Sequence, residues 1–125
     1  MVSREESKEY GTYAILRAVN HNRHGEATNL GCSVYNMAGV QIGYKVDDTA
    51  RAIMRGDLDP VWGYTRQILE DTIEHYNTID RVRKTHESTG HAMSGIQIGD
   101  LCGTLIWDGV VDHIYNLFVS GIRKQ

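Results

Sequence analysis

The sequence predicts an α+β fold, a two-layer sandwich in which helices pack on one face of a mainly antiparallel sheet of about four to five strands. Short apolar runs rich in β-prone residues come first along the chain, and amphipathic helical patterns follow them. A turn between the second and third runs indicates a hairpin, which favours an antiparallel sheet. A small α/β domain with one parallel crossover is the alternative.

Three strands are expected in the first part of the chain. Residues 13–19 are apolar on both faces apart from Arg17, which indicates a strand inside the sheet. Residues 30–36 resume the extended pattern, and residues 40–47 alternate apolar and polar side chains beyond a turn at 37–39. Three residues of the second strand are expected on one face, namely Leu30, Cys32 and Val34.

Two helices are expected next. Asp48 can cap a short helix over residues 49–55, which Gly56 would end. Asp59 followed by Pro60 is a strong helix start, and the apolar spacing up to Ile79 predicts one amphipathic helix of about five turns.

The remaining segment is expected to form a loop, two extended pieces and a helix. Residues 83–95 lack periodicity and are interpreted as a loop. Residues 96–98 and 101–107 are β-prone, with an interruption at Gly99 and Asp100, and an apolar stripe after the cap Asp108 predicts a final helix.

The composition bounds the function. With 125 residues, 41% of them apolar, the chain is expected to form a single domain over 10–125 after a flexible N-terminus over 1–9. A net charge of −3 argues against general nucleic-acid binding. The absence of an apolar run of about 20 residues argues against a membrane span, and the charged start is unlike a signal peptide. Two cysteines make no disulfide framework, so a cytoplasmic location is expected.

A polar cluster follows the first expected strand and is the first candidate binding site. It comprises Arg17, Arg23, His24, Glu26 and Asn29. A buried guanidinium needs a partner, so one interpretation is a structural ion pair between Arg17 and Glu26, with Asn29 bonding the turn backbone. The other interpretation is a pocket for an anion, because arginine forks suit phosphate and carboxylate groups.

The expected loop at 84–95 is the second candidate, because its hydroxyls and amides could wrap a phosphate. It lacks the residue order of a P-loop, and a plain connector between helix and strand is the alternative. The ligand-binding residues assigned to this region are Lys84, His86, Ser88, Thr89 and His91. Tyr64 is added because its ring could stack on a base.

The sequence assigns no residues to metal binding or catalysis. His21, His24 and Glu26 have plausible ligand types, but a third histidine would have to come from elsewhere in the chain. No Ser-His-Asp order, no paired carboxylates and no dinucleotide fingerprint occur. We therefore expect no cofactor and no metal, and we lean against an enzyme.

The segments 13–17, 23–26 and 29–31 resemble the opening of domain-of-unknown-function family 3037, short proteins of bacteria and their phages. The family pattern Y-x-[LV]-[LV]-R is followed by R-G-E-x-x-N-[LV]-G, and His24 is inserted here before the glycine. The likeness covers about residues 10–122 and carries over a set at Arg17, Glu26 and Asn29. The family has no assigned activity, and its members tend to lie near HipA-like kinase genes or in mobile elements.

Three functions follow as hypotheses. The first is a non-catalytic, phage-type protein that captures a small anionic, nucleotide-like ligand and sequesters a host defence signal, with the pocket between copies of a homo-oligomer, a dimer or higher. The second is a protein-interaction module that regulates a partner such as a HipA-like kinase. The third is a small hydrolase with His24 or His91 as the base beside Glu26.

Overall fold

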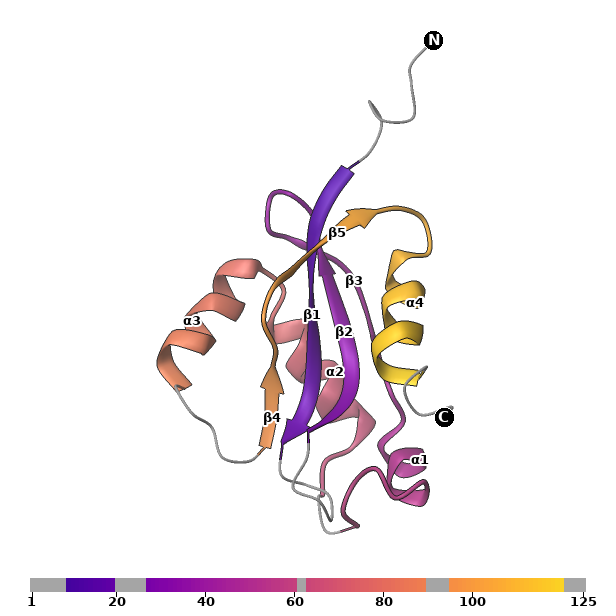
Figure 1. Ribbon diagram of the computed structural model, residues 1–125. Helices are drawn as coiled ribbons and strands as arrows, with labels where there is room; N and C mark the ends of the chain where they lie inside the picture. Colours follow the sequence, from indigo (N-terminus) through magenta and orange to yellow (C-terminus); the bar gives the residue numbers. More distant parts are fainter. Residues whose placement is uncertain (1–8, 20–26, 61–62, 90–94, 121–125) are drawn as a thin grey trace.

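The sheet is built around one long strand, β1 (Figure 1). The computed structural model describes residues 9–19, 27–60, 63–89 and 95–120. Within them five strands form an open sheet of order β3-β2-β1-β4, and β5 also pairs with β1. All pairings are antiparallel. The strands are β1 (Glu9–Val19), β2 (Thr28–Tyr35), β3 (Gln41–Val46), β4 (Gly95–Ile98) and β5 (Cys102–Ile106).

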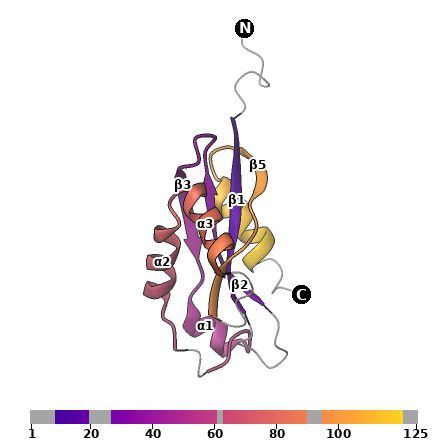
Figure 2. The ribbon, with the colours of Figure 1, turned by 90° about the vertical axis from the view of Figure 1, so that its left-hand side faces the viewer.

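Helices lie on both sides of this sheet. The helices are α1 (Thr49–Met54), α2 (Arg66–His75), α3 (Ile79–Thr89) and α4 (Val110–Tyr115), which continues as a π-helix, η2 (Asn116–Ser120). In the turned view α3 stands in front of the strands and α4 behind them (Figure 2). The predicted α+β class with an antiparallel sheet is confirmed, but α4 covers the face opposite to α2 and α3, so the helices are not confined to one face. None of the described helices has the length and apolar content that a membrane crossing requires.

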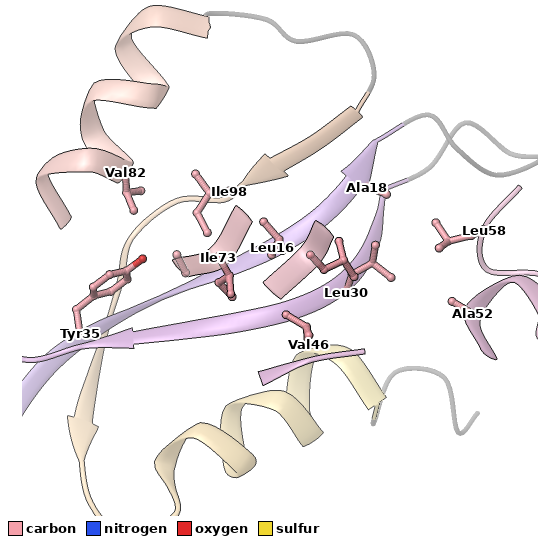
Figure 3. Packing of buried hydrophobic residues seen from close by; sticks show 12 residues of the cluster. Leu16, Ala18, Leu30, Tyr35, Val46, Ala52, Leu58, Ile73, Val82 and Ile98 are labelled. Atoms are coloured by element: carbon pink, nitrogen blue, oxygen red, sulfur yellow. The ribbon is translucent and has the colours of Figure 1, made fainter. Parts of the chain in front are cut away.

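Side chains on the two faces of β1 belong to two separate apolar clusters. Ala14, Leu16 and Ala18 are buried in the cluster beneath α2 and α3 (Figure 3). Tyr13 and Ile15 pack in the second cluster beneath α4. A strand with covered faces on both sides must be apolar at both parities, which explains the continuous apolar run that the sequence shows.

A bulge reverses the faces of β2. Leu16 pairs with Gly31 but Arg17 pairs with Asn29, so Leu30 is an extra residue opposite β1. Leu30 therefore joins the α2–α3 cluster, whereas Cys32 and Val34 join the α4 cluster. The prediction that these three residues share one face was wrong.

The short helix α1 agrees with the sequence. The carboxylate of Asp48 accepts a hydrogen bond from the Ala50 N–H at 3.0 Å, as expected of a helix cap. Gly56 follows the helix with a φ of 84°, which favours glycine.

The predicted five-turn helix is instead two helices. The first begins after Thr65, whose hydroxyl accepts from the Ile68 N–H at 3.3 Å, and not at Asp59. It ends at His75 because the next turn bonds to the sheet: the Tyr35 hydroxyl donates to the Tyr76 carbonyl at 2.6 Å, and the Gln41 N–H donates to the Asn77 carbonyl at 2.8 Å.

Other boundaries also differ from the prediction. Helix α3 covers residues 79–89, so the expected loop over 83–95 was wrong for its first part. Strand β1 begins at Glu9, inside the segment expected to be flexible. The final helix is capped at Gly109 and not at Asp108.

Two strand glycines offer a matched test of the sheet. A Cβ on Gly11 would overlap the Tyr35 carbonyl oxygen and the Ile106 side chain, whereas a Cβ on Gly103 would meet nothing within 4 Å. We expect Gly11→Ala to lower the free energy of unfolding by about 3 kcal/mol, because the backbone must shift to relieve the overlap. Gly103→Ala should change it by less than about 0.5 kcal/mol. Urea denaturation measures both, and equal effects would contradict the packing described.

Candidate functional site

Three polar side chains share the α4 face at the end of β1. Arg17 has the same parity on β1 as Tyr13 and Ile15, which pack beneath α4. In the ladder it pairs with Asn29 on β2 and with Gln97 on β4. The structure thus brings Arg17 and Asn29 together, as the sequence predicted, and adds Gln97.

Asn29 connects this cluster to the helix above it. Its side-chain amide donates to the Phe118 carbonyl of η2 at 2.8 Å. The Phe118 ring in turn stacks on Tyr13, with ring centroids 5.4 Å apart. Asn29 therefore holds the end of η2 against the sheet, which is a structural role that the predicted turn-backbone bond did not foresee.

The guanidinium of Arg17 is the unusual group of the cluster. Its Nε is buried, and among the described residues it has no hydrogen-bond partner. The guanidinium carbon lies beside Gly99, 4.0 Å from where a Cβ would stand. Leaving a buried donor unsatisfied costs about 1–3 kcal/mol, so a group of this kind is a natural place for an acceptor to bind.

The strand ends that flank the two predicted binding segments are neighbours in the sheet. Ala18 pairs with Thr28, and Val19 pairs with Gly95, so the described residues that flank the segments 20–26 and 90–94 lie at the same end of the sheet. Four predicted binding residues fall in these segments and lie outside the described residues, namely Arg23, His24, Glu26 and His91. The proposed ion pair between Arg17 and Glu26 therefore stays a prediction.

The predicted site residues at 84–89 lie on a helix. Lys84 forms an ion pair with Asp80 at 3.2 Å, and the Ser88 hydroxyl donates to the Thr85 carbonyl at 3.3 Å. Thr89 is the last residue of α3. Helical amides are already bonded within the helix, so residues 84–89 cannot wrap a phosphate as a loop would. The expectation of a loop over these residues was wrong, whereas their assignment as ligand-binding residues stays a prediction.

His86 has a structural contact of its own. Its Nε2 lies 2.9 Å from the Ile98 carbonyl oxygen, and because a carbonyl can only accept, Nε2 carries the proton. This bond joins α3 to β4 on the side of the sheet away from the Arg17 side chain. Tyr64, 37% exposed, precedes α2, whereas the helix expected from Asp59 to Ile79 would have included it.

The described titratable groups form no metal site. Within residues 9–19, 27–60, 63–89 and 95–120, no three histidine, cysteine or acidic side chains come close enough to hold an ion. The two thiols differ: Cys32 is buried beside α4, whereas Cys102 is exposed. Burial raises the pKa of the Cys32 thiol to about 12, so it remains protonated at neutral pH.

Gln97 is the residue that the sequence did not reveal. It was expected within a short extended segment, and its polar side chain between two isoleucines indicated only an alternating strand. Its place beside Arg17 depends on the register of β4 against β1, which pairs residues 80 positions apart. No local pattern carries that register.

Comparison with known proteins identifies no relative: no family model, no curated protein and no solved structure matches the chain. The resemblance to family 3037 therefore stays a prediction.

The pKa of Cys32 predicts a loss of stability in alkali. The unfolded thiol ionises near pH 9, whereas the folded thiol does so only near pH 12. The folded state therefore binds more protons between these values, and the free energy of unfolding falls as the pH rises above 9. Urea denaturation at pH 7.5 and pH 10.5 should show a smaller fall for Cys32→Ala than for the wild type. Cys102→Ala, which alters the exposed thiol, should keep the wild-type fall; identical falls for both variants would refute the assignment.

Proposed function

We propose that the protein is a non-catalytic binding protein that captures a small anionic ligand on the α4 side of the sheet, with the Arg17 guanidinium as the anchoring group. The observation that carries the proposal is the buried Nε of Arg17, which has no partner within the described part of the chain. A guanidinium offers a planar fork of donors that fits phosphate and carboxylate oxygens.

The neighbours of Arg17 suit such a ligand. Asn29 and Gln97 flank it on the two adjacent strands, and neither side chain adds a negative charge that would repel an anion. Arg17 pairs with β2 beside the bulge and with β4 on its other side, so the ladder fixes its position on both sides. A rigid cationic anchor between neutral amides favours binding over proton-transfer chemistry.

The ligand class we favour is nucleotide-like. A nucleotide combines phosphate oxygens for the guanidinium with a base that flanking segments could enclose. The Arg17 cluster lies on one face of a small domain. The proposal is therefore that two copies of the chain together form the complete pocket. The resemblance to family 3037 extends it to the sequestration of a signalling nucleotide.

The hydrolase hypothesis depends on residues that have no described position, since both proposed bases, His24 and His91, lie outside the described part. Among the described histidines, His86 is committed to the Ile98 carbonyl. No described contact therefore favours this alternative.

The substitution Arg17→Met separates binding from structure, because methionine keeps an apolar stem and removes the buried donor. If the guanidinium awaits a ligand, the variant should be more stable than the wild type by about 1 kcal/mol in the absence of ligand. It should also lose the rise in melting temperature that linear or cyclic nucleotides produce in the wild type. Thermal-shift titrations, followed by calorimetry, measure both effects.

Arg66→Met is the matched control, because Arg66 is an exposed arginine on α2 that pairs with Glu70. It should keep the response to nucleotides. A clear loss of stability in ligand-free Arg17→Met would instead favour the structural ion pair, and a wild-type chain that no nucleotide and no inorganic phosphate stabilises would refute the proposal.

A further inference from the structure

The edges of the sheet differ in how they are covered. The start of β3 is bonded to the α2–α3 turn by the Gln41 N–H, and Val40 forms a bridge with Thr78. The outer carbonyl of Ile98 on β4 is bonded by His86 of α3. Covering of this kind prevents a sheet edge from pairing with other chains.

The edge at β5 has no comparable cover within the described part of the chain. The Gly99 N–H donates to the Ile15 carbonyl at 2.8 Å, so odd-numbered residues of β1 direct their backbone groups toward β4 and β5. Tyr13 and Gly11 therefore bond Cys102 and Thr104 in the ladder. Gly103 and Leu105 direct their own N–H and C=O groups away from β1, toward the open edge.

The surface around this edge is apolar and open. Tyr10 and Leu105 are directly opposite one another on β1 and β5, and they are 59% and 40% exposed. Trp107 directly follows β5 and is 50% exposed. A Cβ on Gly103 would meet nothing within 4 Å, so the face of β5 is open at this position. Strand β5 itself contains no charge and no proline, which are the usual devices that block an edge.

Three exposed carboxylates surround the same edge. Asp100 and Asp108 flank β5, and Glu9 is opposite Ile106 on β1. Residues 95–120 contain no lysine or arginine, and none of the three acids forms an ion pair with a described residue. The described charges at this edge are therefore negative, and a complementary partner is positive.

We propose that β5 binds an extended, basic segment of a partner protein, which adds to the sheet as a strand. The main-chain groups of Gly103 and Leu105 would pair with the segment, and Leu105 would contact its apolar side chains. Lysine or arginine at the ends of the segment would face Asp100 and Asp108. Gly103 and Leu105 pair with the N-terminal half of β1, whereas Arg17 lies near its C-terminal end, and the proposal does not rest on the anion site.

Charge decides against a second copy as the occupant. Two β5 strands paired about a twofold axis at Thr104 would place Asp100 of each copy opposite Asp108 of the other. Like charges directly opposite one another destabilise a strand pair. A basic segment removes this repulsion and replaces it with attraction.

Two synthetic peptides test the proposal. The first has the sequence Lys-Lys-Val-Thr-Val-Thr-Val-Lys-Lys, and the second has glutamate in place of every lysine. In fluorescence anisotropy at low ionic strength the basic peptide should bind at least about tenfold more tightly than the acidic one, and added salt should reduce the difference. Asp100→Asn combined with Asp108→Asn should remove most of the preference. Asp71→Asn, an exposed carboxylate on α2, is the control and should keep it.

Hydrogen exchange followed by NMR reports the pairing itself. In the free protein the Gly103 and Leu105 amides should exchange rapidly, whereas those of Cys102 and Thr104 should be protected by β1. The basic peptide should slow exchange at Gly103 and Leu105. Leu105→Pro removes an outward N–H that β1 does not use and should abolish binding, while Leu105→Ala keeps this N–H and should weaken binding less.

Three results would overturn the proposal. The first is protection of the Gly103 and Leu105 amides in the free monomer, which would mean that the edge is already covered. The second is a doubling of the mass in sedimentation, with protection that depends on protein concentration, which would identify a second copy as the occupant. The third is equal binding, or no binding, of the two peptides.

Discussion

The pairing of β1 with strands on both of its sides is the constraint on which the structure depends. Strand β2 pairs along one side, and β4 and β5 share the other, with β4 at the C-terminal end of β1 and β5 at its N-terminal end. Because α2 and α3 cover one face and α4 the other, β1 must be apolar at both parities. Arg17 departs from this rule near the end of the strand. It lies beyond the apolar cluster beneath α4 and close to the residues that flank the segments 20–26 and 90–94.

Local patterns predicted the elements whose signals are local. The hairpin of β2 and β3, the capped helix α1 and the broken extended segment of β4 and β5 all appear where the sequence placed them. The predictions that were wrong concern features that depend on contacts between residues far apart in the chain. The break between α2 and α3 exists because Tyr76 and Asn77 give their carbonyls to Tyr35 and Gln41, which are more than 30 residues away in the chain. Helical periodicity continues through that turn and carries no trace of these bonds.

The candidate site was predicted in part for the same reason. A single arginine within an apolar strand is unusual in itself, so Arg17 could be identified from the sequence without a structure. Asn29 was associated with it correctly, but its bond to the Phe118 carbonyl depends on where the last helix packs. Residues 84–89 were expected to form a loop because their hydroxyls and charges mask the helical pattern. The side of the helix that contacts the sheet has only Ile79 and Val82 as apolar residues, and His86 continues it.

The two ends of β1 carry opposite charge, and this has a consequence for how their surfaces relate. Arg17 and Glu9 are separated by about 26 Å along the strand, at about 3.3 Å per residue. At physiological salt the Debye length is about 8 Å, so the two ends do not influence each other through the solvent. Two routes connect an anion at Arg17 with β5: the strand that both share, and the segment of Gly99 and Asp100 that leads from β4 into β5 beside the guanidinium. Because the middle of β1 is buried on both faces and paired on both sides, it is the part least able to adopt a second arrangement.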